Sequence, residues 1–289
     1  MGQHIIFDFD GTITEEDTIG NIARAALEWR KTSEGGGADL SRDWQSIVES
    51  YTQDLAAYDH TQPPEQQRTT WQHERDYLRG RNVVEAASLA RVRELGIFAS
   101  FADHDRLVEA GRRDRETGRT QVRGGFVEYL AMVRARNYSV HVVSVNWSAD
   151  YIRGVLEPWD ITSIIANEIQ LDGSIAAIPD CLSTSLSNVE PRKALATSAD
   201  KLGATRHLLQ RVGGQCVGYF GDSTTDLECL HFHGGWVITS DGGGSLARTL
   251  RRLGYNVPCV SEPQGANSDI SWAHDFAEVA AHITTGRIL

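Results

Sequence analysis

The hydrophobic pattern divides the chain into three stretches. The first is a short apolar run at residues 4–7, which predicts a buried strand that ends at Asp8 and leads into a loop after Asp10. In the second, from about 16 to 120, β-branched runs are scarce and Arg, Glu, Ala, Gln and Leu dominate, which favours helices. From Val122 onward, short β-branched runs alternate with helical segments. This alternation predicts a mainly parallel, doubly wound α/β sheet, with the helical stretch inserted after its first strand.

Capping residues and breakers refine the limits of these elements. The residues that suit helix N-caps or first turns in the insert are Asp17 or Thr18, Ser41, Pro63-Pro64, and Asp103 or Asp105. We expect helices at 17–31, 41–58, 64–94 and 103–116. After the insert, we expect strands at 139–145, 161–169, 215–220, 236–239 and 257–260, and helices at 126–136, 149–156, 198–211, 224–230, 245–253 and 272–283. The predicted organisation is an α/β core of residues 1–14 and 120–289 around an all-helical insert of residues 15–119.

Composition and charge narrow the functional classes. The chain has 289 residues and a net charge of −11, which argues against a nucleic-acid-binding protein because such proteins need a basic face. An anionic substrate stays possible, since a metal ion and one lysine can reverse the sign of the charge locally. No apolar run is long enough to span a membrane and the first residues lack the pattern of a secretory signal, so we expect a cytoplasmic protein. Four cysteines without CxxC spacing, Cys181, Cys216, Cys229 and Cys259, are expected to be free thiols.

The two aspartates at the end of the first strand are the first candidate for chemistry. Side chains alternate along a strand, so Asp8 and Asp10 would point to the same side and repel each other unless a positive charge lies nearby. Mg²⁺ suits such a pair because it prefers oxygen ligands, and a carboxylate at a strand end can also act as a nucleophile or carry protons. The simpler alternative is a strand followed by an Asp-Gly turn. An EF-hand loop is excluded, because Gly11 is only fourth from Asp8 and a strand precedes it.

Three later segments carry further candidates, each of which has a structural alternative. Ser144 lies near a strand end before a helix and could bind a phosphate oxygen, although a plain Ser/Asn turn explains it as well. Lys201 lies at the head of a helix and could hold a phosphate, although most lysines there are simply exposed. Asp222 ends a strand and Asp226 follows in the first helical turn, so both could face one ion or form an ordinary acidic helix start.

The full set of segments resembles the haloacid dehalogenase superfamily. The stretch Asp8-Phe9-Asp10-Gly11-Thr12-Ile13-Thr14 resembles its first motif, and Gly221-Asp222-Ser223-Thr224-Thr225-Asp226 resembles its fourth. Ser144 and Lys201 occupy the positions of the second and third motifs; Lys201 is preferred to Lys193 because one helix and one strand separate it from Gly221. Arg123-Gly124-Gly125-Phe126 resembles the turn by which the phosphoserine-phosphatase-like branch re-enters its core after a helical cap, with Gly124 in place of a proline. The insert itself resembles a C1 cap, and Val145-Asn146-Trp147 departs from the small residues usual after the second motif.

The resemblance implies a Mg²⁺-dependent phosphatase that hydrolyses a small phosphomonoester through an aspartyl-phosphate. It makes Asp8 the nucleophile, Asp10 the general acid and then base, and Lys201 a third catalytic residue. It assigns Mg²⁺ to Asp8, the Asp10 carbonyl and Asp222, with Asp226 ordering the surroundings. The phosphate contacts that it implies are Phe9, Asp10, Gly11, Ser144, Val145, Asn146 and Lys201.

Two alternatives to this function stay open. A metal-independent dehalogenase is disfavoured by Asp10 and by the pair Asp222 and Asp226. A non-catalytic protein of the same fold that binds a metabolite or a partner would be favoured if Trp147 narrowed or blocked the phosphate site. The substrate and the oligomeric state are not predicted.

Overall fold

A six-stranded sheet forms the centre of the protein. The computed structural model describes residues 2–32, 39–177, 193–263, 265 and 268–283. The strand order is β3-β2-β1-β6-β7-β8, and every neighbouring pair is parallel. The strands are β1 Gln3–Phe7, β2 Ser139–Val143, β3 Ser163–Ile165, β6 Gln215–Gly221, β7 Gly235–Ile238 and β8 Ile270–Ala273. The chain builds outward from β1 in one direction and from β6 in the other, so the strand order reverses between these two strands. In such sheets ligands bind beside this reversal, at the carboxyl ends of the strands.

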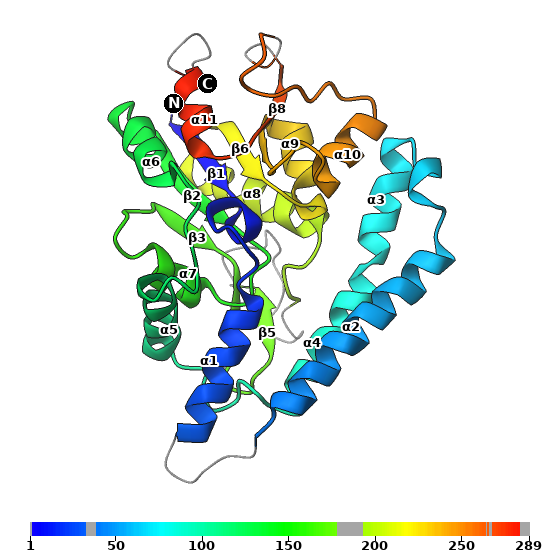
Figure 1. Cartoon of the computed structure of the whole chain (residues 1–289), viewed down its shortest axis with the longest axis vertical. Helices are drawn as coiled ribbons and strands as arrows, with labels where there is room; N and C mark the ends of the chain where they lie inside the picture. Colours follow the sequence, from blue (N-terminus) through cyan, green and yellow to red (C-terminus); the bar gives the residue numbers. More distant parts are fainter. Residues whose placement is uncertain (1, 33–38, 178–192, 264, 266–267, 284–289) are drawn as a thin grey trace.

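Helices cover both faces of the sheet, as the doubly wound prediction requires (Figure 1). On one face, α6 Phe126–Ala135 and α11 Phe276–Ile283 pack on Phe7 and Phe220, whose rings stack at 4.7 Å. On the other face lie α8 Ser198–Val212, α9 Leu227–His233 and α10 Ser245–Arg252, which share a hydrophobic cluster with Ile6 and Tyr219. The neighbouring residues Ile6 and Phe7 thus belong to different hydrophobic clusters on opposite faces of the sheet. Both side chains are fully buried, as expected of a strand covered on both faces.

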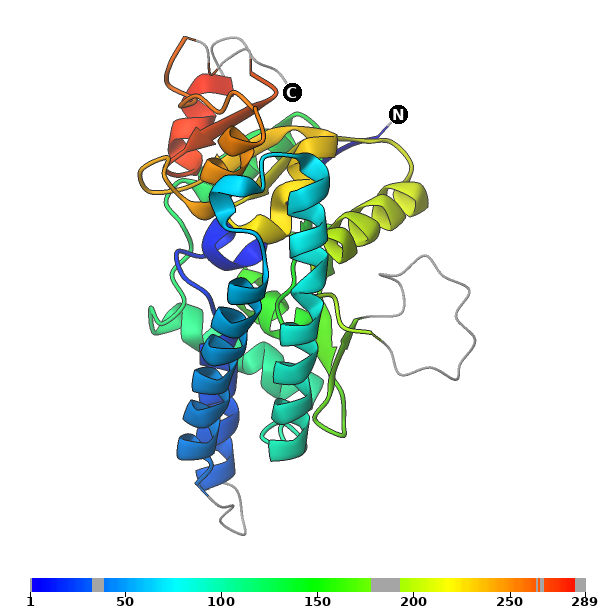
Figure 2. The ribbon, with the colours of Figure 1, turned by 90° about the vertical axis from the view of Figure 1, so that its right-hand side faces the viewer.

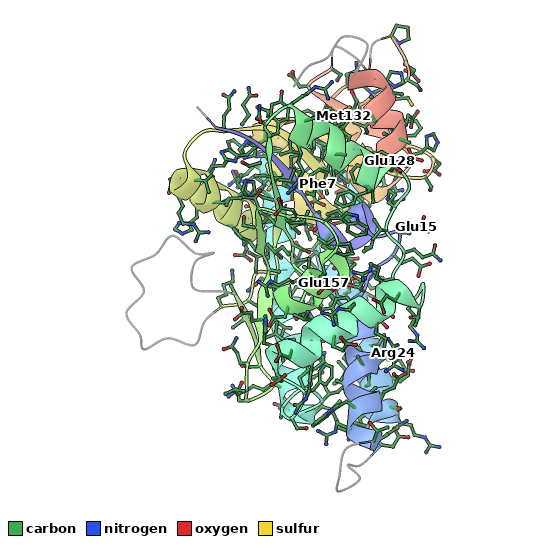
Figure 3. The ribbon with its side chains drawn as sticks, turned by 90° about the vertical axis from the view of Figure 1, so that its left-hand side faces the viewer. Phe7, Glu15, Arg24, Glu128, Met132 and Glu157 are labelled. Atoms are coloured by element: carbon green, nitrogen blue, oxygen red, sulfur yellow. The ribbon has the colours of Figure 1, made fainter. Side chains whose placement is uncertain are left out.

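The helical insert follows the turn Phe9–Ile13 (η1) that ends β1. Its helices are α1 Ile19–Thr32, α2 Ser41–Thr61, α3 Trp71–Gly80, α4 Asn82–Leu95 and α5 His104–Glu116. Figures 1 and 2 show α2 and α4 side by side, with α3 continuing to the edge of the core next to α10. At the other end, α5 packs against α7 Ala149–Leu156, and Arg24 on α1 (Figure 3) donates to Asp114 on α5 at 2.6 Å. The insert therefore contacts the core at both of its ends.

Two predicted elements of the first two-thirds of the chain are each divided. The expected helix 64–94 is a single 3₁₀ turn, Glu65–Gln67, followed by α3 and α4, which meet after Gly80. A β-carbon at Gly80 would lie 2.1 Å from the hydroxyl of Tyr58, so this close approach requires glycine. The expected strand 161–169 is split into β3, in the main sheet, and β4 Asn167–Ile169, which pairs antiparallel with β5 Ile175–Ala177. At the start of β4, the side chain of Asn167 donates to three backbone carbonyls of neighbouring loops.

The prediction of the last strand is wrong. Residues 257–260 form only an isolated bridge between Cys259 and Trp272, because Pro258 has no N–H group with which to extend a ladder. The outer strand is instead β8, whose last two residues, Trp272 and Ala273, were expected to begin a helix; that helix begins at Phe276. The remaining helices and strands agree with the predictions to within a few residues.

Two predictions from composition can be compared with the described residues. Cys216, Cys229 and Cys259 are free thiols, as expected, and Cys181 lies outside the described residues. Among the helices that the structure describes, none combines the length and apolar character needed to cross a bilayer.

Candidate active site

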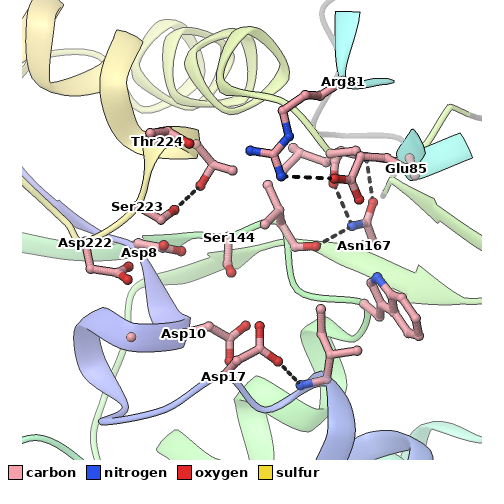
Figure 4. Close-up of a pocket in the computed structure, with 18 of the residues that line it drawn as sticks. Asp8, Asp10, Asp17, Arg81, Glu85, Ser144, Asn167, Asp222, Ser223 and Thr224 are labelled. Carbon is pink, nitrogen blue, oxygen red and sulfur yellow. Dashed lines mark hydrogen bonds and ion pairs between the residues drawn. The ribbon is translucent and has the colours of Figure 1, made fainter. Parts of the chain in front are cut away.

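A cavity of about 560 Å³ opens at the carboxyl ends of β1, β2 and β6, beneath the helical insert. The core contributes Asp8, Asp10, Ser144 and Asp222 to its walls, and the insert contributes Arg81, between α3 and α4, and Glu85 on α4 (Figure 4). The cavity therefore lies beside the reversal of strand order, where the doubly wound fold predicts a ligand site.

A tight turn after β1 brings Asp8 to the cavity. The Asp8 N–H donates to the carbonyl of Phe220 at 2.8 Å, and its side chain accepts from the N–H of Phe9 at 2.7 Å. Gly11 has a φ of 70°, and a β-carbon there would lie 2.3 Å from Asp222 Oδ2. The turn thus needs glycine both for its backbone conformation and for the space that Asp222 occupies.

Arg123 fixes this turn from the re-entry point of the chain. Its guanidinium donates to the carbonyls of Thr12 at 2.9 Å and Gly11 at 2.7 Å, and its backbone N–H donates to Ile13 at 2.7 Å. The sequence indicated residues 123–126 only as a turn, and nothing in the sequence indicated that Arg123 binds the first motif.

Lys201 lies between two aspartates in the interior. Its Nζ is 2.8 Å from Asp8 Oδ1 and 2.6 Å from Asp226 Oδ1, and neither Lys201 nor Asp226 is exposed. Carboxylate oxygens of Asp8, Asp222 and Asp226 lie within 4.8 Å of one another. The competing lysine, Lys193, is exposed and pairs with Asp200 at 2.8 Å.

Asp226 is surrounded by donors and does not line the cavity. Besides Lys201, its carboxylate accepts from the hydroxyl of Tyr219 at 2.7 Å and from the N–H groups of Asp222 and Ser223 at 3.2 Å. A β-carbon at Gly221 would lie 2.3 Å from the Asp226 carboxyl carbon, so this position also requires glycine. The arrangement holds the backbone of Asp222, whose own side chain reaches the cavity and accepts from Thr12 Oγ1 at 3.1 Å.

Burial governs the ionisation of this group. Burial and the charge of Asp226 raise the pKa of Asp8 well above its usual value, although Lys201 opposes the shift. Burial and the charge of Asp226 likewise raise the pKa of Asp222 to about 7. Burial alone would lower the pKa of Lys201, but Asp226 and Asp8 outweigh it and the net shift is upward. The lysine is therefore charged at neutral pH, while the carboxylates are poised to accept a further positive charge.

Asp10 is held by the beginning of the insert and by the loop after β2. Its Oδ1 accepts from the N–H of Thr18 at 2.9 Å and the hydroxyl of Thr18 at 2.7 Å, and its Oδ2 accepts from Asn146 Nδ2 at 2.7 Å. Burial, followed by the charge of Asp17, raises the pKa of Asp10 to about 6. A carboxyl group with such a pKa can donate and accept a proton near neutral pH.

The residues predicted to contact phosphate lie in two groups. Asp10, Gly11, Ser144 and Val145 line the cavity, and the N–H of Ser144 donates to Ile165 at 2.9 Å. Phe9, Asn146 and Lys201 do not line it, and the amide of Asn146 is occupied by Asp10, by Thr18 Oγ1 at 3.0 Å and by the N–H of Ser148 at 2.9 Å.

Trp147 leaves the cavity open. Its ring makes edge contacts with Trp44 and Phe98, each at a centroid distance of 6.1 Å, and it lines the cavity at its border with the insert.

Asn167, which the sequence analysis did not indicate, holds the adjoining loops together by hydrogen bonds. Its Nδ2 donates to the carbonyls of Val145, Asn146 and Leu195 at 3.0, 3.0 and 2.9 Å, and its Oδ1 accepts from the N–H of Leu195 at 2.7 Å.

Comparison with models of protein families shows the family to which the chain belongs. Residues 5–231 match the model of the haloacid dehalogenase-like hydrolases. The chain belongs to this family. The matched region includes Asp8, Ser144, Lys201 and Asp226, so all four motif segments of the sequence analysis fall within it. No curated protein matches the chain significantly by sequence.

Solved structures agree with the family fold. A phosphoserine phosphohydrolase-like protein from Francisella tularensis subsp. tularensis SCHU S4 is 15% identical, with a TM-score of 0.51, over 97% of this chain and 99% of that one. A protein with unknown function from Bordetella pertussis Tohama I is 14% identical, with a TM-score of 0.52, over 89% of this chain and 98% of that one. Both are similar along nearly their whole length, which includes the helical insert as well as the sheet. The predicted fold, a haloacid dehalogenase-type α/β sheet with an inserted helical cap, is confirmed.

Proposed function

We propose that this family member is a Mg²⁺-dependent phosphatase that hydrolyses a small phosphomonoester through an aspartyl-phosphate on Asp8. The observation that carries the proposal is the buried cluster in which Lys201 pairs with Asp8 and Asp226 beside Asp222. Burying charges is costly unless they are paired, so a cluster of this kind needs a reason beyond stability.

The charges of the cluster fit a divalent cation. The formal charges of three carboxylates and one lysine sum to −2, and a divalent ion would balance this charge once the carboxylates have lost their protons to bind it. The donors on the cavity side are carboxylate and carbonyl oxygens, the ligands that Mg²⁺ prefers. Asp8, Asp222 and the carbonyl of Asp10 would hold the ion, with Asp226 fixing the position of Asp222. When bound, Mg²⁺ would supply positive charge to the phosphoryl group.

In the proposed reaction, Asp8 is the nucleophile and Asp10 transfers the protons. A carboxylate oxygen of Asp8 attacks phosphorus while the bond to the leaving alcohol breaks, and Asp10 donates its proton to that alcohol oxygen. In the second half, Asp10 takes a proton from water as the water oxygen attacks phosphorus and Asp8 leaves. The contacts of Asp10 with Thr18 and Asn146 keep its carboxyl group in place for both proton transfers.

The phosphoryl oxygens would be bound by Ser144, Lys201 and the backbone of the two adjoining loops. Charge develops on these oxygens in the transition state, so fixed donors there lower the barrier. Because Lys201 lies behind Asp8, it would act by holding the nucleophile as well as by its charge. The contacts of Phe9, Gly11, Val145 and Asn146 would be made by backbone groups.

We infer that residues 15–119 act as a cap over a catalytic core of residues 1–14 and 120–289. The chain leaves the core and returns to it side by side, since Glu15 N–H donates to the carbonyl of Gln121 at 3.0 Å and Thr14 pairs with Val122. Such a cap would exclude water and select the substrate. A small phosphorylated metabolite is the proposed partner, while the cytoplasmic location and the lack of nucleic-acid binding stay predictions from the sequence.

The test is hydrolysis of p-nitrophenyl phosphate, with and without Mg²⁺, by the wild type, by Asp8→Asn and by Asp43→Asn as an exposed control. We expect phosphate release that needs Mg²⁺, is lost in Asp8→Asn and is kept in Asp43→Asn. Release that persists in Asp8→Asn would refute the role of Asp8. No release from this ester or from a panel of natural phosphomonoesters by folded, metal-loaded wild type would favour a binding protein. Halide release from haloacids without metal would favour a dehalogenase.

A further inference from the structure

One part of the cavity wall is apolar. Ile19, Leu89, Val145 and Trp147 line it, and each is only partly buried. Leu89 and Trp147 pack with their inner surfaces on one hydrophobic cluster of the protein, and Val145 packs on the other. Because these side chains line the cavity, the apolar surface that they leave uncovered is available to a ligand. Covering that surface would release water and stabilise the complex.

Trp147 is held rigidly within this wall. Trp44 contacts its ring at 90° and Phe98 contacts it at 87°, so the ring is fixed from the side of the insert. The flanking residues Asn146 and Ser148 are buried and bound to each other, which fixes the backbone on both sides of the tryptophan. The ring lines the same cavity as Ser144, so it faces space that the remainder of a bound phosphate ester could occupy.

Two charged residues that line the cavity, Arg81 and Glu85, have partners within the protein. Arg81 lies 3.8 Å from Glu85, and the hydroxyl of Tyr51 donates to Glu85 at 2.9 Å. The volume of about 560 Å³ falls within the range of roughly 300–1,000 Å³ for pockets that enclose medium-sized organic ligands. A phosphoryl group on a two-carbon alcohol would leave much of this space, and the apolar wall with it, uncovered.

We propose that the leaving group of the substrate is an alcohol with an apolar group of ring size, and that Trp147 determines this specificity. The proposal rests on the phosphatase function proposed above. It names a class of substrate, phosphomonoesters of arylmethyl and similar alcohols, in preference to esters of compact polar alcohols.

The test compares kcat/KM for benzyl phosphate and ethyl phosphate with the Mg²⁺-loaded enzyme. Both esters release a primary alcohol, so their ratio reports mainly the pocket. At about 25 cal/mol per Å² of apolar area covered, the ring should favour benzyl phosphate roughly 10- to 50-fold. Trp147→Ala should lower this ratio roughly tenfold and Leu89→Ala roughly threefold, whereas Trp147→Phe should keep most of it. Val83→Ala, an exposed position on the same helix as Leu89, should leave the ratio unchanged.

The outcomes separate this inference from the function on which it rests. A benzyl preference that falls in Trp147→Ala and in Leu89→Ala supports it, and Leu89→Ala decides alone if Trp147→Ala does not fold. Equal turnover of the two esters by the wild type, or a preference that both variants retain, overturns the inference while the phosphatase function stands. No turnover of either ester or of p-nitrophenyl phosphate overturns both.

Discussion

Replacing Lys201 by methionine should destabilise the protein strongly. The substitution keeps the length of the side chain and removes its charge, which leaves Asp8 and Asp226 facing each other. These carboxylates are 3% and 0% exposed, so water cannot replace the lysine. Breaking a buried ion pair by removing one partner costs about 3–5 kcal/mol, a large part of the roughly 5–15 kcal/mol by which a typical domain is stable.

The loss should depend on pH in a defined direction. In the wild type Lys201 opposes the upward shift in the pKa of Asp8, so its removal raises that pKa further. A protonated carboxyl group no longer suffers the repulsion, and the difference in stability between wild type and variant should shrink as pH falls from 7 to 5. Asp226→Asn added to Lys201→Met removes one of the two charges and should restore part of the stability, but no activity.

The measurement is the free energy of unfolding in urea without metal, at pH 7 and pH 5, for the wild type, Lys201→Met, the double variant and Lys193→Met. Lys193 is the matched control, because it is exposed and its pair with Asp200 contributes at most about 1 kcal/mol. A loss below about 1 kcal/mol for Lys201→Met at pH 7, or a loss equal to that of Lys193→Met, would contradict the assignment of a buried charge pair.

Three further predictions follow from the site and the sheet. Gly11→Ala should lower the free energy of unfolding by about 1–3 kcal/mol and abolish activity, because the added β-carbon would displace Asp222. Gly20→Ala, where the added β-carbon meets open space, should leave stability unchanged or raise it, and equal stability of the two variants would refute this reasoning. Mg²⁺, titrated by its effect on the melting temperature, should bind more weakly at pH 6 than at pH 8, since the pKa of Asp222 is about 7 and ligands must be deprotonated; pH-independent affinity would count against Asp222 as a ligand. Burial lowers the pKa of His141 to about 4. As pH falls from 6.5 to 4, the free energy of unfolding of the wild type should therefore fall by about 3 kcal/mol more than that of His141→Asn. Unfolding free energies that change in parallel with pH in the two proteins would exclude this.

The sheet and the motif segments could be predicted because their signals are local. The apolar run before Asp8, the Gly-Asp end of β6 and the helix start that contains Lys201 each depend on a few neighbouring residues. The cap residue Asp103, which accepts from the N–H of Arg106, likewise had a local signal. The error at the last strand occurred where a long-range contact overrides a local pattern. Trp272 begins an apolar stretch that reads as helix, yet it pairs with the backbone of Pro258 and Val260 as a strand.

The positioning residues of the site had no such signal. Asn167 interrupts an apolar run and could be any polar residue of a strand until its four hydrogen bonds to the loops at Val145 and Leu195 are seen. Arg123 is one arginine among many, and its contacts with Gly11 and Thr12 join positions more than 100 residues apart. A single sequence carries no information on pairs at this separation.

The walls that select a substrate depend on the same kind of contact. The α3 end of the insert is fixed to the core by Glu74, which is 1% exposed and accepts from Arg68 at 2.9 Å and from Arg252 on α10 at 3.0 Å. Arg75 adds a bond to Glu228 on α9 at 2.6 Å, only two residues after Asp226. These pairs fix α3 on the core, and the chain continues from α3 through Arg81 into α4, which carries Leu89; both residues line the cavity. The proposed catalytic groups thus lie at strand ends that the sequence indicates directly, whereas the wall proposed to select the substrate depends on ion pairs between distant segments. The family could therefore be predicted from the sequence, and a leaving group could be proposed only from the structure.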